Sequence, residues 1–243
     1  MLLIFACLWI ASLVGLIYGY AFLDYLLPQT SFFSFLGALN FFFVIGIPVI
    51  GLVLLVTRLF FGAHILPTWR TGLWAFWGIN LLSLATITGL TIKDFQTRRD
   101  IVITKNKTLT NADTLIIRIE EDPYDDDWGM LMNELQLSGD ELISRSIEVD
   151  IKKGTSGLFQ FDQKVSARGK NTADALSRAQ TIEYQPRIDQ NTLWLPPGFV
   201  IPRGSKWRNQ RVKINIQVPE GKFVKIVPPV NQCLHELDIG ESV

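Results

Sequence analysis

The stretch Gly72–Ile92, GLWAFWGINLLSLATITGLTI, divides the chain into an apolar part and a charged part. It contains no Asp, Glu, Lys or Arg, and it matches the roughly 20 residues that a helix needs to cross a bilayer. Trp74 and Trp77 lie near its start, where aromatic rings prefer the headgroup level, and Lys93 and Asp94 follow its end. The sequence therefore predicts a membrane-spanning helix here, and not a core helix of a soluble protein.

Two further apolar segments precede this stretch, and we expect three crossings, at about 2–27, 36–61 and 72–92. A signal peptide at the start would need basic residues before the apolar run and a small-residue cleavage site after it. Neither feature is present in the sequence. The apolar run begins at Met1 itself, which is consistent with Met1 being an internal boundary of a longer protein.

Charge is distributed very unevenly along the chain. Of the 23 basic and 23 acidic residues, only Asp24, Arg58 and Arg70 precede the end of the third apolar segment. The remaining residues, about 150, are enough for one well-buried core. We therefore expect a helical membrane module at 1–95 and one β-domain in water at 96–243. The formal net charge is zero, which argues against nucleic acid as a partner.

Basic residues in short connectors predict the orientation in the membrane. Arg58 and Arg70 flank the connector between the second and third spans, whereas the first connector has no Lys or Arg. Because basic connectors remain in the cytoplasm, the charged domain is expected on the other side of the membrane. Lys93, Arg98 and Arg99 favour the opposite orientation, but large domains are translocated largely regardless of their charge.

The few small and polar residues in the spans indicate helix packing. Ala11, Gly15 and Gly19 recur every four residues and form a face that another helix can approach closely, either in this chain or in a second copy. Asn40 and Asn80 are expected to hydrogen-bond between helices. No Lys, Arg or pair of carboxylates lies deep in a span, so we do not expect a path for ions or protons.

The charged part follows the two-residue period of β-strands. SIEVDIK at 146–152 places its branched apolar residues on one face and its polar residues, Asp150 among them, toward water, and VKINIQV at 212–218 repeats this alternation. Less regular strands are expected at 115–119, 159–165, 182–188 and 193–195. Many short strands separated by Gly and Pro turns indicate a mainly-β domain.

One helix interrupts the predicted strands. TADALSRAQ at 172–180 is rich in helix formers, and Asn171 is placed to cap its N-terminus. Leu176 and Ala179 are expected to face the sheet, because residues three apart lie on one side of a helix.

Three blocks of the sequence occur in an order that resembles a known family. Ile201–Ile226 contains a Gly-Ser-Lys-Trp-Arg turn, the alternating strand and a Pro-Glu-Gly-Lys turn, while Leu59–Phe95 contains the tryptophan-bearing third span. Ala167–Tyr184 contains the short helix. Together they resemble the C-terminal part of bacterial PspC-type (phage shock protein C) envelope-stress proteins, in which a LiaI/LiaF-like membrane module leads into a toast-rack β-domain.

The resemblance implies a fold, a place and a role. The fold would be a solenoid-like stack of strands, with a β-sandwich as the alternative, and the family's cytoplasmic PspC domain usually lies upstream. The chain would lie in the bacterial cytoplasmic membrane, with its β-domain in the periplasm or outside. It would be a non-enzymatic sensor or regulator of envelope stress that contacts membrane lipids and a regulatory protein, or associates with itself. A structural or adhesive β-domain on a membrane anchor is the alternative.

The most suggestive surface feature is a basic turn near the last predicted strand. It could bind anionic lipid headgroups or an acidic partner. The structural alternative is a turn whose tryptophan packs into the core while the charges are solvated. The residues of this predicted surface are Arg203, Lys206, Trp207, Arg208 and Arg211.

Motifs for catalysis, cofactors or metals are not found. His64 and His235 lie in different parts of the chain, as do Cys7 and Cys233, so neither a histidine metal cluster nor a disulfide is expected. The acidic run Glu120–Asp127 lacks the terminal Glu of a calcium loop and is expected to be solvated. A hydrolase would need acidic residues that converge in a cleft, and no motif selects such a pair. We therefore predict no catalytic, cofactor or metal site.

Overall fold

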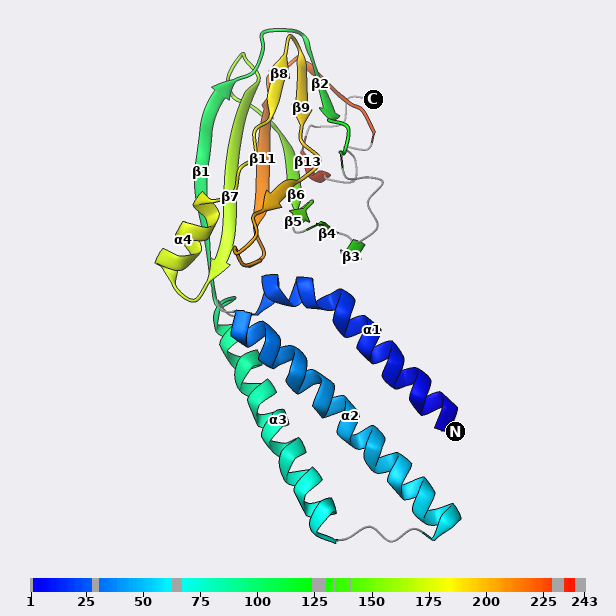
Figure 1. The fold of residues 1–243 in the computed structure, drawn as a ribbon. Helices are drawn as coiled ribbons and strands as arrows, with labels where there is room; N and C mark the ends of the chain where they lie inside the picture. Colours follow the sequence, from blue (N-terminus) through cyan, green and yellow to red (C-terminus); the bar gives the residue numbers. More distant parts are fainter. Residues whose placement is uncertain are drawn as a thin grey trace. The chain divides into compact units, whose positions relative to one another are not determined.

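The computed structural model describes residues 2–27, 31–62, 67–123, 130–132, 134–139, 141–228 and 234–238. The chain forms two compact units, Met1–Lys93 and Asp94–Val243, and Figure 1 shows their elements. The first unit is helical, and the described residues of the second form three β-sheets and one short helix. The predicted combination of long apolar helices with a mainly-β domain is confirmed.

The helical unit consists of α1 (Leu2–Leu26), α2 (Ser31–Phe61) and α3 (Pro67–Lys93). Within the described residues, two segments are long and apolar enough to span a membrane, Phe32–Phe60 in α2 and Trp69–Lys93 in α3. Most residues of both segments are at least partly exposed on the surface of the helical unit, since only 17% of the most apolar 18 residues of each segment are buried. α1 is a helix over the first predicted span, and its crossing of the membrane stays a prediction.

Aromatic rings and hydrogen bonds join the three helices. The rings of Trp9 in α1 and Phe42 in α2 stack with centroids 5.5 Å apart. Phe43 in α2 meets Phe76 in α3 edge to face at 5.0 Å, and Trp77 Nε1 donates to the Val44 carbonyl at 3.0 Å. α2 is therefore the central helix of the unit, in contact with both neighbours.

The largest sheet has the strand order β1-β7-β11-β6-β13. β11 pairs with β7 in antiparallel fashion and with β6 in parallel fashion, so the alternating apolar segment predicted from the sequence is a central strand. β1 is an edge strand with two register shifts and several charged residues, features that discourage pairing with other chains. The bounds are β1 (Thr97–Thr108), β6 (Ile147–Lys153), β7 (Gln160–Gly169), β11 (Arg211–Val218) and β13 (Leu234–Asp238).

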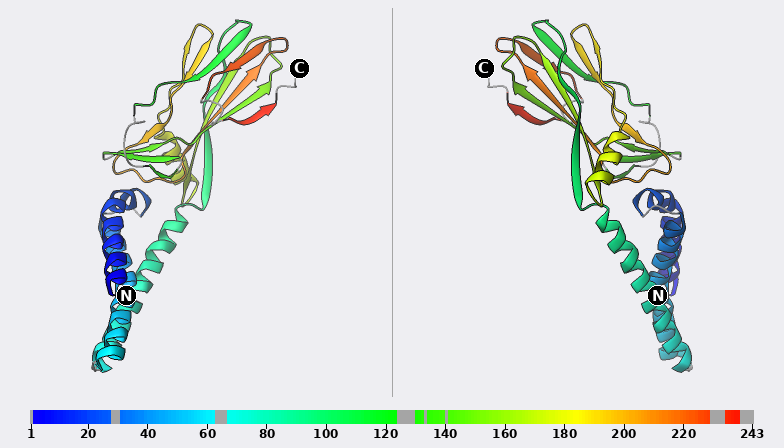
Figure 2. Two further views of the ribbon diagram at one scale, coloured as in Figure 1. Left: turned by 90° about the vertical axis from the view of Figure 1, so that its right-hand side faces the viewer. Right: turned by 90° about the vertical axis from the view of Figure 1, so that its left-hand side faces the viewer.

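Two four-stranded sheets complete the domain, with the orders β12-β2-β9-β8 and β10-β5-β4-β3. None of the three sheets is closed or curled in the described residues, and Figure 2 shows the sheets from two sides. The solenoid-like stacking of strands stays a prediction. The bounds are β2 (Thr114–Ile119), β3 (Met130–Met132), β4 (Leu135–Ser138), β5 (Glu141–Ser144), β8 (Arg187–Asp189), β9 (Thr192–Leu195), β10 (Phe199–Ile201) and β12 (Phe223–Ile226).

The short helix α4 (Thr172–Gln180) has the predicted bounds. The Asn171 side chain accepts a hydrogen bond from the Asp174 N–H at 2.9 Å, which satisfies one of the free donors at the helix start. The predicted inner face is partly wrong, because Ala175 and Ala179 are fully buried whereas Leu176 is half-buried. The helix lies so close to β7 that a Cβ on Gly169 would come within 2.5 Å of the Ala175 nitrogen. Only small residues fit this contact.

Two further predictions need correction. Asp150, expected to face water, is 1% exposed, and the side chain of Lys213 on the neighbouring strand β11 places its Nζ 2.7 Å from the Asp150 carboxylate. The strand predicted at 182–188 is confined to β8. Residues 182–186 are irregular, consistent with Pro186, which lacks the N–H that a sheet requires.

Candidate functional site

A buried arginine fastens the start of the β-domain, directly after α3. Arg208 is 0% exposed, and its Nη2 and Nε donate to one carboxylate oxygen of Asp94 at 2.7 and 3.2 Å. Asp94 follows Lys93, the last residue of α3, and is 114 positions from Arg208 in the sequence. We call this ion pair, together with Phe95, the connector clasp.

Phe95 also has contacts with residues of the β-domain. Its ring meets the Trp207 ring edge to face at 5.8 Å, and the Arg208 guanidinium lies 5.1 Å from the ring centroid. The Phe95 carbonyl accepts a hydrogen bond from Arg168 Nη1 at 3.2 Å. Only Phe95 and Gln96 separate Asp94 from the first residue of β1. The residues that link α3 to β1 are therefore anchored within the β-domain.

Backbone contacts hold the arginine side of the clasp. The Arg208 N–H donates to Gln210 Oε1 at 2.7 Å, and Gln210 Nε2 donates to the Lys206 carbonyl at 2.9 Å. Asn209, between them, has a φ of 51°, in the left-handed region that asparagine tolerates better than most residues. The Arg208 carbonyl accepts from the Arg168 N–H at 2.8 Å. These hydrogen bonds hold the basic turn in place and join it to Arg168, near the end of β7.

Burial and pairing act on the Arg208 charge in opposite directions. Burial lowers the pKa of the guanidinium, and the hydrogen bonds and charge of Asp94 partly restore it. An arginine stays protonated in proteins, so the clasp contains a permanent buried cation. Removing Asp94 would leave that cation without its carboxylate, which is far more costly than breaking a surface pair.

The five residues of the predicted lipid or partner surface occupy different environments. Lys206 and Arg208 are buried, at 4% and 0% exposure, and Trp207 is half-buried against Phe95. Arg203 is exposed and Arg211 is half-buried, with Nε donating to Asn209 Oδ1 at 3.2 Å. A surface role stays a prediction for this turn, and Arg203 is the member that the structure places in solvent.

An acidic cleft opens elsewhere in the β-domain, with a volume of about 610 Å³. Prolines and Phe199 form part of its wall. Asp122 is paired with Arg145 at 2.6 Å, and Glu120 lies 3.5 Å from Arg187, so two of the carboxylates are partly neutralised. The acidic residues that line the cleft are Glu120, Glu121, Asp122, Glu141 and Glu183.

Several residues that the sequence analysis considered for metal binding lie outside the described part of the chain. In the part of the chain that the structure describes, no group of three or more His, Cys, Asp or Glu residues is placed to hold a metal ion. His64 and Cys233 lie outside the described residues, as does the stretch 124–127 of the acidic run. Asp122, within that run, forms the ion pair with Arg145, so this carboxylate has a protein partner.

The predicted helix-packing residues also divide into two groups. Asn40 Nδ2 donates to Ser83 Oγ across α2 and α3 at 2.7 Å, whereas Asn80 Nδ2 donates to the Phe76 carbonyl of its own helix at 2.8 Å. A Cβ on Gly15 or Gly19 would meet no atom within 4 Å. Ala11 is exposed, so this small-residue face has no close contact with the described part of the chain. A contact with a second copy stays the other predicted use.

Sequence reasoning missed Asp94 and Phe95 as partners of the basic turn. The sequence does offer one signal, an acidic residue placed directly after an apolar span, but the partner 114 residues away cannot be identified from spacing. The β-domain therefore begins at Asp94, directly after an apolar helix long enough to span a membrane, and Arg208 of the same domain binds the Asp94 carboxylate.

Comparison with protein-family models gives a match for the larger part of the β-domain. Residues 135–242 match the family model described as the ToastRack found in some PspC proteins. This part of the chain is therefore a toast-rack domain of PspC proteins, and two candidate membrane helices precede it. Neither curated proteins nor solved structures gave a match. The match begins at β4, so β1 and β2, which pair with β7 and β9, complete its sheets from outside the matched range.

Proposed function

We propose that the chain is a non-enzymatic, membrane-embedded sensor or regulator of bacterial envelope stress. Its toast-rack domain would bind a partner or envelope component, and α3 would carry the resulting change across the membrane. The connector clasp is the observation that carries this proposal. Only three residues separate α3 from β1, and two of them are anchored by Arg208, Trp207 and Arg168.

The clasp supports signalling more than simple tethering. A tether works equally well with a flexible linker, which keeps a domain near the membrane without transmitting its movements. In this chain, the position where a linker would lie is occupied by a buried ion pair and an aromatic contact. A displacement of the basic turn would therefore move Asp94, the residue that directly follows α3.

The proposed orientation places the toast-rack domain outside the cytoplasm, in the periplasm where an outer membrane exists. It rests on the basic flanks of the α2–α3 connector. If α3 crosses the membrane once, this connector and the β-domain lie on opposite sides. Single cysteines at His64 and at Gln185, in a chain without Cys7 and Cys233, test this. A membrane-impermeant thiol reagent should label Q185C in intact cells, after any outer membrane is opened, and label H64C only after the cytoplasmic membrane is opened.

The signalling role is tested by deleting the gene and measuring an envelope-stress transcriptional reporter during membrane damage. The expected result is a changed response in the deletion strain, restored by the wild-type chain. An unchanged response would contradict the proposal. A pull-down with the full chain in detergent then separates the alternatives, because recovery of cell-wall polymer without a regulatory membrane protein would favour an adhesive or structural role.

A further inference from the structure

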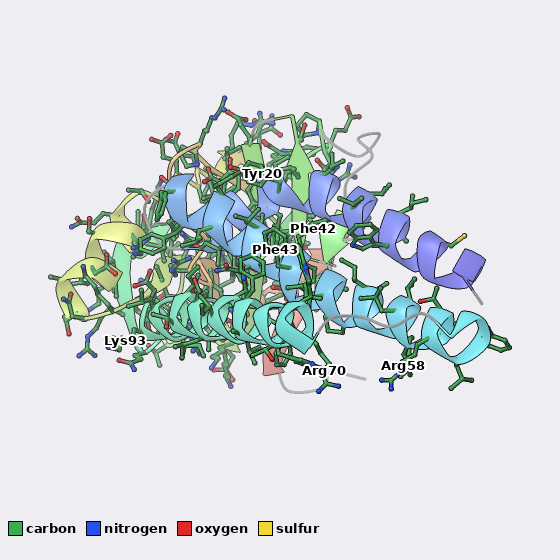
Figure 3. The ribbon with its side chains drawn as sticks, turned by 60° about the horizontal axis from the view of Figure 1, so that its bottom comes forward. Tyr20, Phe42, Phe43, Arg58, Arg70 and Lys93 are labelled. Carbon is green, nitrogen blue, oxygen red and sulfur yellow. The ribbon has the colours of Figure 1, made fainter. Side chains whose placement is uncertain are left out.

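A groove between α2 and α3 combines apolar walls with two guanidinium groups at one end. Its volume is about 370 Å³, and its walls include Leu55 of α2 and Trp74 of α3. Arg58, near the end of α2, and Arg70, near the start of α3, line the same groove. Figure 3 shows both arginines at the α2–α3 connector end, with Lys93 at the opposite end of α3.

The groove is open on the outside of the helix pair. The side chains of Leu55 and Trp74 are 57% and 59% exposed, although both are large and apolar. A Cβ on Gly51, in the middle of the α2 wall, would meet no atom within 4 Å. In a bilayer such an opening fills with lipid, because lipid chains are the surrounding solvent.

Within the described helices, the two arginines have no carboxylate partner. Asp24 is the sole acidic residue before Asp94, and it accepts a hydrogen bond from Ser34 Oγ at 3.0 Å, near the start of α2. Arg58 lies 24 residues further along that helix, which at 1.5 Å per residue is about 36 Å away. Any anion that pairs with these two exposed cations must therefore come from outside the helical unit.

The dimensions of the groove fit one lipid in one leaflet. Its α2 wall runs from Ile47 to Arg58, which is about 17 Å along the helix axis. Half of the hydrocarbon core of a bilayer is about 15 Å thick. A chain that starts at the interfacial arginines and follows the groove would therefore end close to the bilayer midplane.

We propose that this groove binds one anionic phospholipid, whose headgroup phosphate contacts Arg58 and Arg70 while an acyl chain lies along Gly51, Leu55 and Trp74. Guanidinium forks pair with phosphate oxygens through two hydrogen bonds each, and the apolar walls need a hydrocarbon occupant. A zwitterionic lipid fits less well, since its ammonium group offsets the phosphate. The site is independent of the toast-rack domain and of the sensor role.

The full chain in detergent micelles, titrated with phosphatidylglycerol and separately with phosphatidylcholine, tests this by native mass spectrometry of bound lipid. Wild type should prefer phosphatidylglycerol. The double variant R58Q/R70Q should bind it about 30-fold more weakly, because each basic group near an anionic lipid contributes roughly a factor of five. R58K/R70K should lose only part of the affinity, because it keeps the charge but not the bidentate geometry.

A second variant tests the groove without changing charge. Gly51→Leu places a side chain into the open space of the α2 wall and should weaken phosphatidylglycerol binding at least tenfold. Gly89→Leu, which also enters open space but lies outside the groove, is its matched control, and Lys93→Gln is the control for charge. Both controls should bind as wild type does.

Three results would overturn the proposal. They are equal binding of the two lipids by wild type, unchanged binding by R58Q/R70Q or Gly51→Leu, and displacement of the bound lipid by millimolar inorganic phosphate. The last result would assign the arginines to a soluble anion.

Discussion

Removing the carboxylate of the connector clasp should destabilise the β-domain strongly. In the variant Asp94→Ala the buried Arg208 cation loses two hydrogen bonds, of 2.7 and 3.2 Å, and its nearest negative charge. Deleting one partner of a buried ion pair typically costs 3–5 kcal/mol. The Asp94 side chain is itself 16% exposed, so water can partly replace it, and we expect the lower end, about 3 kcal/mol.

Hydrogen exchange of the full chain in detergent measures this loss. Amides in the central strands β7 and β11 exchange through opening of the whole domain, and about 3 kcal/mol corresponds to exchange about 100-fold faster at 1.4 kcal/mol per tenfold. Glu220→Gln is the matched control. It removes a carboxylate from an ion pair with Lys153 whose side chains are 64% and 85% exposed, and such pairs contribute little to stability.

A second variant tests the physical reason for that loss. In Asp94→Ala combined with Arg208→Met, the buried charge is gone, so the double variant should be more stable than Asp94→Ala alone. Unchanged exchange in Asp94→Ala would refute the clasp as a stabilising contact. A double variant as unstable as the sum of both single variants would refute the unpaired charge as the cause.

Three further predictions concern other parts of the chain. Gly169→Ala should destabilise the domain by about 2 kcal/mol in urea unfolding, because its Cβ would lie 2.5 Å from the Ala175 backbone nitrogen. Gly157→Ala, whose Cβ would enter open space, is the control. Equal urea midpoints of the two variants would contradict the prediction. Burial raises the pKa of Asp174, but Arg178 and the Lys170 N–H lower it more, to below its ordinary 3.8. The charge of Asp174 therefore stabilises the domain above about pH 4, and this contribution is lost as the pH falls through the folded-state pKa. On acidification, the urea midpoint of Asp174→Asn should fall less than that of wild type. Midpoints of the two proteins that fall in parallel with pH would contradict the prediction. Asn40→Ala should weaken the α2–α3 contact by about 0.6 kcal/mol, the average for hydrogen bonds between membrane helices. Unfolding in detergent measures this loss. If the effects of Asn40→Ala and Ser83→Ala simply add in the double variant, the hydrogen bond between them does not contribute.

The elements that were predicted well are those that carry a strong local pattern. The long apolar runs, the capped helix α4 and the alternating strands β6 and β11 all lie where the sequence indicates. β1 was missed because its described side chains are mostly exposed, so its segment TRRDIVITKNKT is mostly charged and polar and has no apolar alternation.

The candidate site was harder to predict because its contacts are distant in sequence. Arg208 lies within a run of basic residues, which usually indicates a solvated surface. Its partner Asp94 lies 114 positions earlier in the sequence, at the start of the domain. Asp150 was misplaced for a related reason, because its ion-pair partner Lys213 comes from β11, a strand distant in sequence. Local periodicity identifies faces of a strand, but not whether other residues cover them.

The most direct test of the proposed signalling path is to interrupt the connection while keeping both units intact. A six-residue Gly-Ser insertion between Lys93 and Asp94 leaves α3 and the clasp unchanged and adds flexible chain between them. The same insertion after Gly62, in the α2–α3 connector, is the control. We expect the insertion before Asp94 to abolish the response of the envelope-stress reporter to membrane damage, with β7 and β11 still protected from exchange and the control still responding. A full response from the chain with the insertion before Asp94 would contradict transmission through the connector clasp.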